Sequence, residues 1–143
     1  MLPPTHPLAE LLREDTRYKY DAYVFVFEAL SYAQNVLGMG QEAESETVEH
    51  ALDEEESDEP QRHVSGQELC EGIRRFALQQ YGLMSKTVLN SWGIKSTDDF
   101  GHIVFNLVRI GKMRKTPHDR LEDFHNVYDF ETAFQQEFRI GPD

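Results

Sequence analysis

Residues 63–113, HVSGQELCEGIRRFALQQYGLMSKTVLNSWGIKSTDDFGHIVFNLVRIGKM, contain three helix patterns in close succession. The first begins with a capping box, in which the side chains of Ser65 and Glu68 each accept a hydrogen bond from the other residue's backbone N–H. Apolar residues then recur at three- and four-residue steps up to Tyr81, and Gly82 follows where a left-handed residue ends a helix. The spacing therefore predicts a helix from Ser65 to Tyr81.

The second pattern is short, from Ser85 to Trp92, and stops at Gly93. The third starts near Thr97, has two aspartates in its first turn and ends near Gly111. It places six apolar side chains in one wide arc: Phe100, Ile103, Val104, Leu107, Val108 and Ile110. An arc of this width indicates packing by several neighbours, so we expect this helix at the centre of the core.

Two short segments after this helix, 113–116 and 126–130, have the character of strands joined by a polar loop. Three helices followed by a hairpin is the element order of a winged helix-turn-helix domain, with the third helix in the recognition position. We therefore predict a mainly α fold with a small β hairpin (α+β). Its winged-helix-like core spans residues 63–138, and residues 139–143 form a tail.

The N-terminal extension, residues 1–38, supplies a further helix. Residues 8–13 have the pattern of one or two helical turns, and the apolar spacing after them predicts one helix from about Asp21 to Leu37. Besides its main face, this helix carries a second apolar strip, made of Phe25, Tyr32 and Val36. A single domain rarely leaves such a strip exposed, so it meets another part of the fold or a second subunit. The strip is our candidate partner surface.

Acidic residues are concentrated in one segment. Residues 41–61 contain ten Asp and Glu and no Lys or Arg, whereas the rest of the chain contains 14 basic and 16 acidic residues. Like charges with few apolar groups do not offset the entropy of ordering, which predicts a disordered acidic linker over residues 39–62. Most of the net charge of −12 therefore comes from the linker. Residues 62–120 are mildly basic, with ten basic and five acidic residues.

Several protein classes lack support in the sequence. No run of 18 apolar residues predicts a membrane span, and the N-terminus has neither the basic region nor the apolar core of a signal peptide. A single cysteine, Cys70, excludes an intramolecular disulfide and fits a reducing compartment. We expect a cytoplasmic protein.

Four blocks in order, DAYVFVFEAL, HVSGQELCEGIRRFAL, KTVLNSWGIKSTDDFGHIVFNLV and EDFHNVYDF, resemble a family of small conserved bacterial proteins of unknown function. The resemblance covers most of the chain outside the acidic linker. It implies a bacterial cytosolic origin, and it assigns no activity or functional residue.

Basic residues gather at the end of the third helix and in the predicted wing, where winged-helix proteins contact phosphates. The candidate nucleic-acid contacts are Arg109, Lys112, Arg114 and Lys115. On the exposed face of the same helix, His102 and Asn106 are residue types able to read base edges. The two aspartates at its N-terminal end oppose this reading because they repel phosphate, and solvated surface charge is the alternative.

The sequence gives weaker evidence for a metal-binding or catalytic site than for a nucleic-acid contact. His118, Asp119, Asp123 and His125 lie close in sequence without the spacing of a metal site, and Cys70 has no evident base beside it. We predict no catalytic residue, no metal site and no cofactor, and the sequence does not indicate whether a small molecule binds.

Three functions remain open. The first is a non-enzymatic protein-interaction or scaffold module, with a homodimer through the N-terminal helix as one form. The second is a DNA-binding winged-helix regulator that uses the basic residues above. The third is an enzyme whose site no isolated motif reveals.

Overall fold

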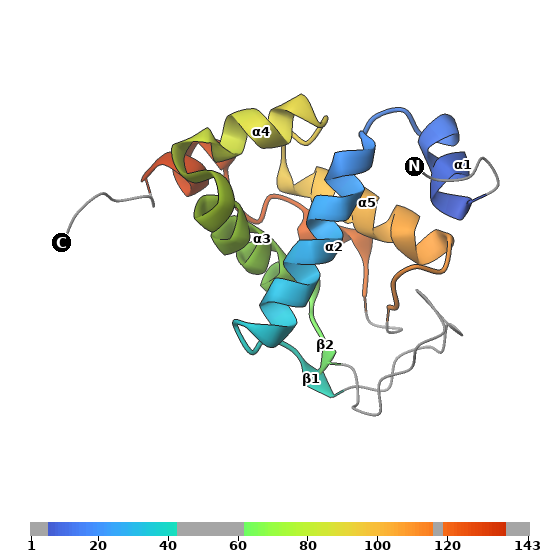
Figure 1. The fold of residues 1–143 in the computed structure, drawn as a ribbon. Coiled ribbons are helices and arrows are strands. Elements are labelled where there is room, and N and C mark those ends of the chain that lie inside the picture. The colour runs from blue at the N-terminus through green and yellow to red at the C-terminus, as the bar shows by residue number, and fades with distance from the viewer. Residues whose placement is uncertain (1–5, 43–61, 116–118, 137–143) are drawn as a thin grey trace.

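The chain folds mainly as α-helices in the part that the computed structural model describes, residues 6–42, 62–115 and 119–136. Figure 1 labels the helices α1 Pro7–Glu14, α2 Tyr20–Asn35, α3 Gly66–Tyr81, α4 Ser85–Ser91 and α5 Thr97–Arg109. Shorter elements connect or follow them: β1 Gln41–Glu42, β2 Arg62–His63, the 3-10 turns η1 Gly82–Met84 and η2 Leu121–Phe124, and a single π-helical turn, η3 Thr132–Gln136.

Helix α3 begins and ends where its sequence predicts. The backbone N–H of Ser65 donates to Glu68 over 3.0 Å, and the N–H of Glu68 donates to the Ser65 hydroxyl over 3.1 Å. At the other end Gly82 has a φ of +55°. The capping box and the glycine stop are therefore confirmed, and the predicted helices 85–92 and 21–37 correspond to α4 and α2.

Helix α2 lies across α3 and α5, as Figure 1 shows. Its crossing with α3 is close because small residues meet there: a Cβ placed on Gly72 would lie 2.8 Å from the Cβ of Ala33. Six residues of α2 are buried along this contact and the one with α5: Ala22, Tyr23, Phe25, Val26, Ala29 and Ala33.

Helix α5 is the central helix, as its apolar arc predicts. Phe100 and Ile103 have no exposed surface, and Leu107 is 3% exposed. Phe100 stacks on Phe130 with ring centroids 5.6 Å apart. Arg109, at the C-terminal end of α5, is exposed, and the other residues of this helix are buried or partly buried.

The predicted β hairpin is wrong, and the α+β class with it. Residues 113–115 and 126–129 form no strand, residues 116–118 lie outside the described part, and the segment between contains the η2 turn. Segment 126–130 instead bonds to helices: the N–H of Val127 donates to the Thr97 hydroxyl, and the Tyr128 hydroxyl donates to the carbonyl oxygen of Cys70. Because Val127 and Tyr128 of this segment bond to α5 and α3, the segment does not pair with another strand.

The winged-helix assignment fails for a related reason. A recognition helix needs one open face, but η2 packs against α5 so closely that a Cβ on Gly101 would lie 2.9 Å from the Phe124 side chain. On another side of α5, His102 and Asn106 bond to the segment between α1 and α2 and to α2 itself. The helix placed in the recognition position is therefore enclosed by its own chain.

Only the two ends of the predicted acidic linker, residues 39–42 and 62, belong to the described part of the chain. Gln41 pairs with His63 and Glu42 with Arg62 in a two-residue antiparallel contact, and Met39 packs on the core. The disorder predicted for the rest of the linker, and the tail 139–143, lie outside the described residues. Phe134 is fully buried, as expected for the end of the core.

Gly93 ends α4 at a point where two backbones almost touch. Its φ is +96°, and a Cβ on it would lie 2.1 Å from the carbonyl oxygen of Arg17. The N–H of Lys19 donates to the carbonyl oxygen of Trp92 over 3.2 Å. This contact holds the connection between α1 and α2 against the end of α4.

We predict that Gly93→Ala lowers the free energy of unfolding by about 3 kcal/mol, because the new methyl group collides with rigid backbone and the left-handed φ disfavours a side chain. Gly38→Ala is the matched control: Gly38 has a φ of +69° but nothing within 4 Å of its Cβ position. It should lose only about 1 kcal/mol. Urea denaturation followed by circular dichroism measures both, and equal losses would contradict the backbone contact.

Candidate functional site

The four basic residues predicted to contact nucleic acid lie at and after the end of α5. Arg109 and Arg114 are exposed, whereas Lys112 and Lys115 are partly buried. The Arg109 guanidinium lies 3.5 Å from a carboxylate oxygen of Glu14, across the gap between α5 and α1. Both arginines of the group are therefore exposed, Arg109 is ion-paired, and the described residues around them form no wing.

The predicted base-reading residues belong to a polar cluster instead. The amide nitrogen of Asn106 donates to Asp15 over 3.0 Å and to the Tyr23 hydroxyl over 3.1 Å. The Tyr18 hydroxyl donates to Asp99 and lies 3.1 Å from Nδ1 of His102. These side chains point at each other, so the predicted base-reading residues bond to the chain itself.

The ion pair between Arg17 and Asp15 keeps the Asp15 carboxyl group ionised. Two guanidinium nitrogens of Arg17 donate to the carboxylate of Asp15, over 3.0 and 2.7 Å. These bonds, with the one from Asn106, hold the pKa of Asp15 well below its usual range. Burial, aided by the bond to Asp99, raises the pKa of Tyr18 well above its usual value, so this phenol keeps its proton. The cluster joins the connection between α1 and α2 to α5.

The predicted partner surface is mostly covered by the chain itself. Phe25 is only 3% exposed, because α3 and the end of α4 pack over it, so it is not a surface residue. Tyr32 is half-buried against Phe76. Val36, at the end of α2, is 65% exposed. For Phe25, the alternative of burial in its own core holds.

Covering this strip creates another surface, which we call the aromatic row. It consists of Tyr32, Phe76, Phe25, Tyr81 and Trp92. Successive ring centroids are 5.1 Å apart for Tyr32–Phe76, 5.3 Å for Phe76–Phe25 and 5.5 Å for Phe25–Trp92. Tyr81 stands edge-on to Trp92 with centroids 6.0 Å apart.

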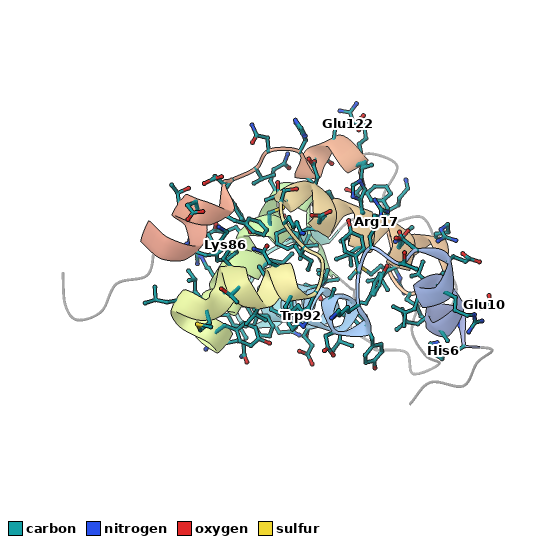
Figure 2. The ribbon with its side chains drawn as sticks, turned by 90° about the horizontal axis from the view of Figure 1, so that it is seen from above. His6, Glu10, Arg17, Lys86, Trp92 and Glu122 are labelled. Atoms are coloured by element: carbon teal, nitrogen blue, oxygen red, sulfur yellow. The ribbon has the colours of Figure 1, made fainter. Side chains whose placement is uncertain are left out.

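Four of the five rings are half-buried, so each shows part of its surface to solvent around the buried Phe25. Directly after Tyr81, Leu83 and Met84 are 55% and 57% exposed. Figure 2 places Trp92 between α4 and α2, at the edge of the molecule opposite Glu122 of η2. The row is therefore an apolar surface of three helices, with exposed aliphatic residues close to it in sequence.

Carboxylates accompany the row on α2. Asp21, Phe25, Glu28 and Tyr32 recur at three- and four-residue steps and lie along one side of the helix. Burial raises the pKa of Tyr81, and the negative charges of Glu28 and Asp21 raise it further, which places both carboxylates within electrostatic reach of this ring.

A separate pocket of about 280 Å³ lies where α4, the start of α5 and the segment before η3 meet. Its charged groups are largely paired: Lys86 lies 2.7 Å from Glu131, and His125 lies 3.1 Å from Asp98. Asn126, on its wall, has a φ of +54°. The paired charges indicate no particular ligand class.

Neither of the other chemical candidates gains support. His118 lies outside the described residues, and in segments 6–42, 62–115 and 119–136 no three His, Cys, Asp or Glu side chains come together as metal ligands. Cys70 is fully buried, and burial raises the pKa of its thiol to about 12, which suppresses the thiolate that nucleophilic chemistry needs.

Comparison with protein-family models, curated proteins and solved structures found no match for this chain. The resemblance to a bacterial family therefore stays a prediction. Among the helices in the described segments, none combines the length and apolar character that a membrane span requires.

The sequence did not identify Phe76, Tyr81 or Trp92 as residues of a candidate surface. A signal was present, because Tyr81 and Trp92 each stand immediately before a glycine that ends a helix. A ring at a helix end has neighbours on fewer sides, and it remains partly accessible. The pairing of the two rings across α3 and α4 is a tertiary contact that no spacing rule predicts.

We predict that Asp15→Asn lowers the free energy of unfolding at pH 7 by about 1–3 kcal/mol, because it removes charge-assisted hydrogen bonds. The folded-state pKa of Asp15 is depressed, so its contribution is complete above the unfolded pKa of about 3.9 and is lost as pH falls toward the folded value. The difference between the two proteins should be constant from pH 5 to 7 and narrow below about pH 4.

Glu10→Gln is the control, since it removes an exposed carboxylate of α1 outside the cluster. Chemical denaturation at several pH values measures all three proteins. A stability difference for Asp15→Asn that is unchanged at pH 3, or matched by Glu10→Gln, would contradict the ion pair.

Proposed function

We propose that this protein is a non-enzymatic protein-interaction module that binds its partner through the aromatic row. The single observation behind the proposal is the arrangement of the rings: Tyr32, Phe76, Tyr81 and Trp92 are partly exposed around a buried Phe25. Large aromatic side chains supply most of the affinity in many protein interfaces, particularly where they are already ordered before binding.

The rigidity of the row supports this role. Each ring contacts at least one other ring with centroids between 5.1 and 6.2 Å apart, and the helices beneath them are joined by the Ala33–Gly72 contact. A partner therefore meets side chains that have little conformational freedom left to lose, which lowers the entropic cost of association.

The homodimer predicted from Phe25, Tyr32 and Val36 is now a weaker form of this proposal. In a two-fold interface the same patch occurs on both sides, so Asp21 and Glu28 of both copies would enter one interface. Like charges at close range oppose that contact. A partner of different composition fits better.

DNA binding through Arg109, Lys112, Arg114 and Lys115 stays a prediction that no contact among the described residues favours. Its architecture, an exposed recognition helix and a wing, is not the fold of this chain. An enzymatic function likewise remains an open prediction.

The test uses peptides selected from a random library that lacks tryptophan, with the full chain as the target. Trp92 is the only tryptophan, so its fluorescence reports binding at the row. We expect selected peptides to change Trp92 emission, and Tyr81→Ala to weaken their binding about tenfold, the loss of a typical aromatic hot spot.

Leu121→Ala is the control, because Leu121 is 41% exposed on η2, at the opposite edge from Trp92 (Figure 2). It should leave affinity unchanged, and circular dichroism verifies that each variant is folded. Peptides that bind without affecting Trp92, or that respond equally to both variants, would refute the proposal. Light scattering of the free chain separately detects a dimer.

A further inference from the structure

The rim of the aromatic row is negatively charged on the α2 side. Asp21 and Glu28 are both exposed, and their positions on the helix place them beside Phe25 and Tyr32. Their charge acts on the Tyr81 ring, as the direction of its pKa shift indicates. Two carboxylates thus stand next to partly exposed aromatic rings.

The two arginines closest to the row in sequence, both on α3, share one carboxylate. On α3, Arg75 precedes Phe76, but its guanidinium lies 2.8 Å from a carboxylate oxygen of Glu71. Arg74 bonds to the same carboxylate over 2.6 Å. Gln79 and Gln80, the exposed residues just before Tyr81, are uncharged. This group keeps one net positive charge against the two carboxylates of α2, and the charges that act on the Tyr81 ring are those of Glu28 and Asp21.

We propose that the partner segment bound at the aromatic row is basic, with lysine or arginine side chains next to its apolar anchors. This inference rests on the proposed function and names the chemistry of its partner. A cation above Tyr81 interacts favourably with the ring face and with the nearby carboxylates at the same time. The apolar anchors pack on the remaining ring surface and on the aliphatic residues beside it.

Two other occupants fit less well. A second copy brings its own Asp21 and Glu28, and the acidic segment of the same chain, residues 43–61, has nine acidic residues and no Lys or Arg. Both meet the rim with like charge. A basic partner is attracted instead, and the net charge of −12 attracts it at longer range as well.

The experiment compares three short synthetic peptides that share the same leucine and phenylalanine positions. The intervening residues are Lys and Arg in the first peptide, Gln in the second and Glu in the third. Each is titrated into the full chain at low ionic strength, with Trp92 emission as the readout. We expect the basic peptide to bind most tightly and the acidic peptide least tightly, with the difference shrinking as salt screens the charges.

The decisive variant is Asp21→Asn with Glu28→Gln. It should lower the affinity for the basic peptide by about three- to tenfold, as expected for the loss of two exposed charge pairs. The affinity for the neutral peptide should not change. The matched control is Glu10→Gln with Glu122→Gln, which changes net charge equally at two exposed positions away from Trp92 (Figure 2). It should not change the affinity for either peptide.

The outcomes separate this inference from the proposed function. If the neutral peptide binds as tightly as the basic one and still depends on Tyr81, the interaction surface stands and the charge preference is refuted. If the two double variants lower the affinity for the basic peptide equally, the preference comes from the net charge of the chain and not from Asp21 and Glu28. The inference then also fails. If no peptide binds in a Tyr81-dependent way, both proposals fall. If the chain itself dimerises through Tyr81, the row is a surface for self-association and the inference of a basic partner fails.

Discussion

The contact between Ala33 of α2 and Gly72 of α3 is the constraint on which much of the molecule depends. Larger side chains at either position would push the helices apart. With the helices close, Phe25 lies beneath Phe76, and Tyr32 lies against the same ring. The order of the core and the partial exposure of the aromatic row therefore have one origin, the small residues at this crossing.

A second constraint encloses α5. The polar cluster of Asp15, Tyr18, Tyr23, Asp99 and Asn106 bonds the start of α2 and the connection before it to one side of this helix. Phe124 of η2 occupies the space above Gly101 on another side. His102 and Asn106, which resemble base-reading residues in the sequence, thus hold parts of the fold together.

Local signals predict the helices well and their arrangement poorly. The capping box at Ser65 and the glycines after Tyr81 and Trp92 act within a few residues, so the sequence alone places these helix boundaries. The hairpin failed because Val127 and Tyr128 find their hydrogen-bond partners on α5 and α3, far away in sequence. The sequence predicted part of the candidate surface, because Tyr32 belongs to the apolar strip of α2. Its neighbours Phe76, Tyr81 and Trp92 lie on or at the ends of other helices, which spacing along one helix does not reveal.

The pairing of Gln41 with His63 and of Glu42 with Arg62 has a consequence for how this chain tolerates change. The two strands bring the ends of the acidic segment together at the base, below α2 and α3 in Figure 1. The span between the end of α2 and the start of α3 is then independent of how many residues are inserted there. Doubling the length of such a loop costs only about 0.6 kcal/mol of closure entropy. Evolution or an engineer can lengthen, shorten or replace this insert while the helical body keeps its geometry.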